Sequence, residues 1–143
     1  MNKKILSKLA LLSLLLLPSI EAAQVTNTQP LGFDAILAGF TQTITTEPID
    51  PQAAIFTADG TPNTNFKISV VENSILMFLQ PSGSHDIKVE LFKFGGDLDK
   101  QGRGRFGATG LLNNIRIGAR ARVRNDDPSG PYAGTGTLRL TYL

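Results

Sequence analysis

The residues that could perform chemistry are few, because the chain holds one histidine and no cysteine. Ser84-His85-Asp86 contains the three residue types of a hydrolytic triad. Consecutive residues of an extended chain point in alternate directions, so this tripeptide cannot align a nucleophile, a base and an orienting carboxylate. No G-x-S-x-G elbow presents another serine. We therefore expect His85 to be a loop histidine and the protein not to be an enzyme.

Two other short patterns resemble binding motifs. Gly102 to Gly107 satisfies G-x-G-x-x-G, but dinucleotide binding needs a preceding strand and a following helix, which this sequence does not predict. Asp97-Leu98-Asp99 supplies two carboxylates of a calcium loop, and no further acid comes before Asp126. The absence of cysteine and the single histidine exclude thiolate and multi-histidine metal sites. We expect no cofactor, no metal and no nucleic-acid partner, and we interpret Lys100 to Gly110 as a long loop between strands.

A row of arginines marks one face of the clearest strand. Arg116, Arg120, Arg122 and Arg124 alternate with an apolar set that shares the opposite face, namely Ile115, Ile117, Ala119, Ala121 and Val123. This period of two predicts a strand with one buried and one wet face. Like charges two residues apart repel and favour an acidic neighbour. We expect a solvated face; the alternative is an anion-binding face.

The remaining elements that must position these residues are also strands. Ile87, Val89 and Leu91 alternate with charged residues, and then Phe92 and Phe94 fall on the opposite parity, which predicts a β-bulge. The runs 66–71 and 74–79 are separated by two residues, which suits a tight hairpin or one bent strand.

The fold class follows from these runs together with three shorter ones at 41–46, 54–57 and 138–142. The chain has 14 glycines and 8 prolines, which favours short elements joined by turns. About seven to eight short antiparallel strands without helical periodicity are typical of an all-β sandwich of the immunoglobulin-like kind. We expect one such domain over residues 24–143.

Residues 1–23 have the pattern of a secretory signal peptide. Three lysines precede the apolar stretch Leu9 to Leu17, and Glu21-Ala22-Ala23 offers a cleavage point. The apolar stretch is too short for a membrane anchor, so no span is expected in the mature protein. Removing Lys3, Lys4, Lys8 and Glu21 from 14 basic and 12 acidic residues leaves 11 of each. The basic pI of the whole chain is therefore no argument for nucleic acid or membrane binding.

The carboxyl terminus carries the most specific pattern. Gly130 is fourteenth from the end and Tyr142 is penultimate. Alternate residues from Tyr132 share one face of an extended strand, namely Tyr132, Gly134, Gly136, Leu138, Leu140 and Tyr142. This pattern resembles the C-terminal strand of bacterial chaperone–usher pilins. Together with Leu31-Gly32-Phe33 and Gly130 to Thr135, it is similar to Mat/Ecp-type fimbrial major subunits and related secreted bacterial domains of unknown function.

The resemblance implies a structural or adhesive fimbrial subunit. Its sandwich would be incomplete and completed by strand donation, and its C-terminal strand (Gly130, Tyr132, Leu138, Leu140 and Tyr142) would be gripped by a periplasmic chaperone before an outer-membrane usher assembles a homo- or hetero-oligomeric filament. The protein would pass through the periplasm to the cell surface. The candidate donor segment has alternating apolar residues: Leu31, Phe33, Ala35 and Leu37.

Two departures from the family pattern leave an alternative open. Classical pilins often carry a disulfide, which this chain lacks, and Val25, Asn27 and Gln29 followed by Pro30 are a poor insert. If Leu31 to Leu37 instead form the first strand of the domain itself, assembly is in doubt. The alternative function is a self-complete periplasmic binding module for a carbohydrate or small anion.

Overall fold

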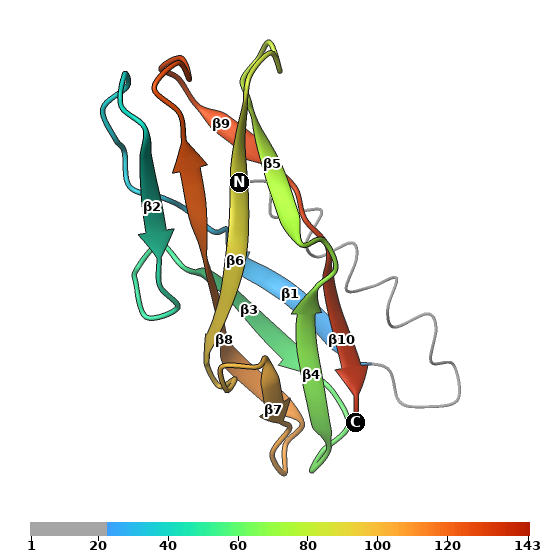
Figure 1. Cartoon of the computed structure of the whole chain (residues 1–143). Coiled ribbons are helices and arrows are strands. Elements are labelled where there is room, and N and C mark those ends of the chain that lie inside the picture. Colours follow the sequence, from blue (N-terminus) through green and yellow to red (C-terminus); the bar gives the residue numbers. More distant parts are fainter. Residues whose placement is uncertain (1–22) are drawn as a thin grey trace.

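The protein is described by a computed structural model in which residues 23–143 are placed. Within this range the structure has ten strands and no helix, arranged in two antiparallel sheets (Figure 1). This confirms the expected all-β, sandwich-like fold class. The predicted signal peptide, apart from Ala23, lies outside the described residues.

A seven-stranded sheet is built around one long strand, β8. On one side β8 pairs with β6, and on the other side it pairs first with β3 and then with β2. Beyond these neighbours lie β1, which pairs with β3, and β5 and β9, which extend the sheet past β6. The bounds of these strands are β1 Gln24–Gln29, β2 Gln42–Thr46, β3 Ala54–Asp59, β5 Ser74–Leu79, β6 Asp86–Gly96, β8 Leu111–Val123 and β9 Tyr132–Gly134.

The second sheet is small, with the order β10-β4-β7. Its strands are β4 Asn65–Val70, β7 Arg103–Arg105 and β10 Leu138–Tyr142, and they occupy the lower right of Figure 1. The inner faces of the two sheets share one apolar core. Phe66 of β4 and Phe106 just after β7 are fully buried there, with their ring centroids 4.6 Å apart. Phe56 and Ile115 complete this core from the large sheet.

The strand pattern predicted for residues 115–123 is confirmed. The five alternating apolar residues are all buried. On the face predicted to be solvated, Arg122 and Arg124 are exposed, whereas Arg116 and Arg120 are half-buried. The predicted bulge in β6 is also confirmed, because the register of β6 against β8 shifts between Glu90 and Lys93. Leu91 does not share the inner face with Val89 as predicted. It lies at the bulge with a φ of 52° and is 53% exposed.

The predicted hairpin between residues 66–71 and 74–79 is wrong. β4 pairs with β10 and β7, whereas β5 pairs with β6 and β9, so the chain crosses from one sheet to the other between them. The two runs are not one bent strand either, because β4 and β5 are separate strands of different sheets. The crossing is fixed by Glu72, whose carboxylate accepts hydrogen bonds from the Thr137 amide at 2.8 Å and the Thr137 hydroxyl.

Two further expectations need correction. The loop predicted from Lys100 to Gly110 contains strand β7. The C-terminal run predicted as one extended strand divides into β9 in the large sheet and β10 in the small one. Strand β1 was not predicted, and neither was the separation of β9, which has only three residues. Among residues 23–143, no helix is long and apolar enough to cross a membrane.

Candidate functional site

Of the triad-like residues, Ser84 and His85 lie on an exposed turn between β5 and β6, and the half-buried Asp86 begins β6. The Ser84 hydroxyl pairs with the Ser82 hydroxyl at 2.9 Å, and the His85 carbonyl accepts the Leu79 amide at 2.9 Å. The side chains of Ser84 and His85 are exposed. These hydrogen bonds stabilise a turn, and the partner of the Ser84 hydroxyl is the Ser82 hydroxyl rather than the His85 imidazole.

Asp97-Leu98-Asp99 and the beginning of the glycine-rich pattern Gly102 to Gly107 form a tight turn next to β7. Asp99 Oδ1 accepts the amides of Gln101 and Arg103, each at 2.9 Å, and Asp97 Oδ2 accepts the Asn114 amide at 3.2 Å. Gly102 has a φ of 84°, and a side chain there would meet the Ile68 carbonyl. In the described part of the chain, no group of three His, Cys, Asp or Glu side chains could hold a metal ion.

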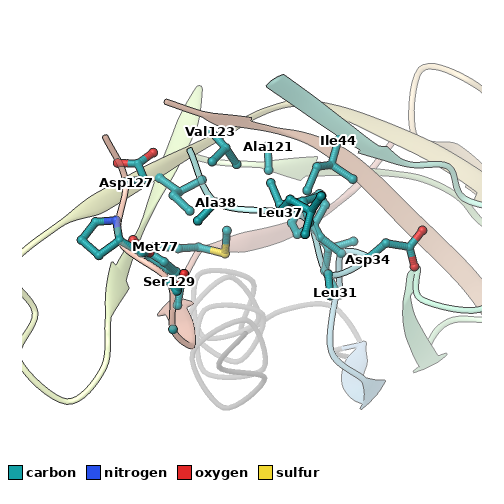
Figure 2. A pocket seen from close by; sticks show the side chains of 18 residues that line it. Leu31, Asp34, Leu37, Ala38, Ile44, Met77, Ala121, Val123, Asp127 and Ser129 are labelled. Atoms are coloured by element: carbon teal, nitrogen blue, oxygen red, sulfur yellow. Dashed lines mark hydrogen bonds between the residues drawn. The ribbon is translucent and has the colours of Figure 1, made fainter. Parts of the chain in front are cut away.

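An apolar groove lies on the inner face of the seven-stranded sheet. Its floor comes from β2, β5, β6 and β8 through Ile44, Met77, Ile87, Ala121 and Val123. Its other walls are the coil of residues 31–38, here called the covering segment, and the loop 127–132. The groove has a volume of about 540 Å³, and none of its lining residues comes from the three-stranded sheet. Figure 2 shows Leu37 lying beneath Ile44 and Ala121, with the Asp34 carboxylate pointing outward.

The covering segment is anchored at its beginning. The Gly32 amide donates to the Gln52 carbonyl at 2.8 Å, and the Gly32 carbonyl accepts the buried Thr46 hydroxyl at 2.7 Å. Within the described residues, no backbone-to-backbone hydrogen bond ties 33–38 to a strand. The segment therefore lies against the sheet without joining it.

The predicted donor residues are all in this segment and differ in burial. Leu31 is buried, Phe33 is half-buried, and Ala35 is exposed. Leu37 is 76% exposed although it borders the groove. All four residues border the groove, but only Leu31 is buried there.

An ionic turn closes one end of the groove. The buried Asp127 carboxylate accepts the Arg124 amide at 2.7 Å and the Arg124 guanidinium at 3.2 Å. This hydrogen bond raises the pKa of Arg124 further above its ordinary value. The Tyr132 hydroxyl donates to the Pro128 carbonyl at 2.7 Å. Burial, supported by the negative charge of Asp127, raises the pKa of Tyr132.

The five predicted residues of the C-terminal strand are not brought together. Gly130 and Tyr132 line the groove. Leu138 and Leu140 are buried in the core between the sheets, and the Tyr142 hydroxyl accepts the Thr61 amide at 3.1 Å. The groove floor was not predicted as a site from the sequence. The alternation in 115–123 placed Ala121 and Val123 on the inner face, but nothing in that pattern shows how far the opposite sheet extends.

Comparison with protein families gives one assignment. The family described as Domain of unknown function (DUF4402) matches residues 19–142, so the chain belongs to that family. Comparisons with curated proteins and with solved structures found no match.

Proposed function

We propose that this member of the DUF4402 family is a structural or adhesive subunit of a bacterial surface fimbria, assembled by β-strand complementation. The observation that carries the proposal is the groove, where the inner face of the large sheet faces a coil in place of a second sheet. An apolar sheet face and free edges are suited to binding an added strand, because main-chain hydrogen bonds supply affinity and side-chain pockets supply specificity.

The covering segment is the donor in this proposal. In its own domain it leaves Leu37 exposed and makes no strand ladder. An extended segment from a neighbouring copy could place alternate apolar side chains on the floor formed by Ile44, Ala121 and Val123. Burying a leucine side chain that is otherwise exposed stabilises a joint by about 1.5–3 kcal/mol. The exchange from intramolecular to intermolecular packing would then be favourable.

Strand complementation also implies an order of events in export and assembly. A strand of a periplasmic chaperone would occupy the groove during export, and an usher in the outer membrane would replace it with the next subunit. Gly130 and Tyr132 are the predicted interaction residues that border the groove. Leu138, Leu140 and Tyr142 lie on β10, which has β4 on one side and is an edge of the small sheet.

A self-complete binding module for a carbohydrate or small anion is the second candidate. It is favoured by the burial of Leu138 and Leu140 in the domain's own core, which leaves the three-stranded sheet complete on its inner face.

Engineered cysteine pairs distinguish the two, because the chain has no cysteine of its own. Leu37→Cys with Ala121→Cys joins the covering segment to the groove floor. In surface material oxidised in place, strand donation predicts a ladder of cross-linked multimers. The control pair is Leu76→Cys with Lys88→Cys, which are directly opposed on β5 and β6 and should close within one chain. Only intramolecular cross-links from the first pair would reject the proposal.

The chaperone is tested separately. Accumulation of the wild type should depend on a cognate periplasmic chaperone, and Tyr142→Ser should reduce export yield, whereas Thr141→Ser should have little effect because Thr141 is exposed. If wild-type levels are the same with and without the chaperone, the self-complete module replaces the fimbrial subunit.

A further inference from the structure

The outer face of β2, β6 and β8, opposite the groove, carries an excess of positive charge. Its exposed or half-exposed cations are Lys88, Lys93, Arg120, Arg122 and Arg124. Arg116 does not belong to this set, because its guanidinium donates to the carbonyls of Pro48 and Asp50, which cover it.

Two of the cations are neutralised by close partners. Lys93 Nζ lies 2.6 Å from Glu47 Oε1. The Arg124 guanidinium lies 3.3 Å from Asp86 and 3.2 Å from Asp127. These pairs leave no cation free at either end of the row.

The centre of the row is different, because three cations share the single carboxylate of Glu90. The distances from Glu90 oxygens are 3.4 Å to Arg120, 3.7 Å to Arg122 and 3.8 Å to Lys88. Glu90 Oε1 is buried and has no hydrogen-bond partner in the described part of the chain. The centre therefore has more positive charge than its one carboxylate can balance.

The strand register places the two surplus cations next to each other. Lys88 on β6 is directly opposite Arg122 on β8, and directly opposed like charges destabilise a sheet. Their side chains are 51% and 59% exposed, so both can reach a ligand. Thr43 on β2 pairs with Arg122 from the other side and adds an exposed hydroxyl.

A shallow hollow of about 520 Å³ lies over these residues. It is lined by the charged residues Lys88, Arg122, Arg124 and Asp86, by Val123, and by Thr41, Gln42 and Thr43 where the chain enters β2. A bound anion would relieve the repulsion between Lys88 and Arg122, and the planar guanidinium group of Arg122 can donate two parallel hydrogen bonds to a carboxylate or sulfate. The exposed Thr43 hydroxyl can hydrogen-bond a sugar hydroxyl.

We propose that this hollow binds an acidic polysaccharide through its carboxylate or sulfate groups, with Lys88 and Arg122 as the anion contacts. Lys88 and Arg122 can contact one acidic group of the polymer, and the exposed Thr43 beside Arg122 can contact the adjoining sugar. An acidic protein would require about 800 Å² of complementary surface, which the hollow does not provide. The site goes beyond the proposed structural role, because it would operate in a free monomer as well as in a filament.

Binding of the purified protein to heparin, polygalacturonate and neutral dextran tests the site. We expect affinity for heparin, polygalacturonate or both, and none for dextran. The double variant Lys88→Gln/Arg122→Gln should lower that affinity by about tenfold or more, since two charge-assisted contacts are lost. Raising the salt concentration should weaken wild-type binding.

The matched control is Lys67→Gln/Arg139→Gln, which removes the same charge from exposed positions on β4 and β10. Its affinity should stay within about twofold of wild type, because surface changes away from a site have small effects. Equal losses in both double variants would mean that only net charge matters and would overturn the proposal. So would wild-type binding to dextran as strong as to the acidic polymers, or no binding to any polymer.

Discussion

The two ends of the sandwich are built differently. Where the three-stranded sheet faces β3 and the start of β8, aromatic side chains fill the space, and Phe56, Phe66 and Phe106 are fully buried. Where β2 and the end of β8 lie, the opposite layer is a coil, and a groove of about 540 Å³ remains. The same alternating strand, β8, supplies the floor at both ends. The difference therefore comes from what covers the sheet, and the covered end should provide most of the stability while the groove end remains available for binding.

Truncating one apolar side chain at each end of the sandwich should give the largest difference in the free energy of unfolding. Phe66→Ala leaves a cavity against Phe106 and should lower the free energy of unfolding by about 3–5 kcal/mol. Leu37→Ala at the groove should change it by less than about 0.5 kcal/mol, because Leu37 is 76% exposed. Denaturant unfolding measures both. A loss of several kcal/mol from Leu37→Ala would show that the covering segment is a packed part of the domain.

Asp127 is the exception at the groove end, where a polar contact provides the stability. Its carboxylate is buried and accepts two hydrogen bonds from Arg124, so Asp127→Ala should cost about 1.5–3 kcal/mol. The neighbouring Asp126 is exposed, and Asp126→Ala should change stability by less than about 0.5 kcal/mol. Thermal melts of the two variants provide the comparison. Equal effects would mean that the turn at 124–127 does not close the groove.

The junction between the two ends depends on Gly118. A Cβ there would lie 2.0 Å from the Thr46 carbonyl oxygen, at the point where the chain leaves β2. Gly118→Ala must displace backbone and should cost about 1–3 kcal/mol. Gly107→Ala is the control, since its Cβ would meet nothing within 4 Å. If Gly118→Ala melts at the wild-type temperature, the close approach of β2 to β8 is wrong.

The parts of this structure that could be predicted from sequence are those with a regular period. The alternation through Ile115 and Val123 is long enough to predict both the strand and its buried face. The parity change after Leu91 predicted the β6 bulge, although not that Leu91 itself would point outward at a φ of 52°. Strands β7 and β9 have three residues each, which is too few for any period to be recognised.

The features that could not be predicted depend on contacts between residues far apart in the sequence. Glu72 and Asn73 have the spacing of a hairpin turn, but the contact between Glu72 and Thr137 directs the chain into the other sheet. Neither the groove nor the charged hollow could be predicted from the sequence. The groove depends on where the small sheet ends, and the hollow depends on the register that sets Lys88 against Arg122.

The smallest expected effect concerns the two tyrosines of the chain, Tyr132 beside the groove and Tyr142 beside Phe106. The chain has no tryptophan, so its phenols can be followed by ultraviolet absorbance. In a Tyr142→Phe variant, Tyr132 is the only phenol, and its ultraviolet absorbance should titrate above the ordinary value near 10. Burial, together with the charge of Asp127, raises this pKa and thus favours the neutral phenol in the folded state. That contribution to stability is complete below the unfolded pKa and is lost as the pH rises through the folded pKa. The advantage of wild type over Tyr132→Phe in unfolding free energy should therefore shrink at alkaline pH. A Tyr132 titration at or below the ordinary value would mean that this end of the groove is open to water.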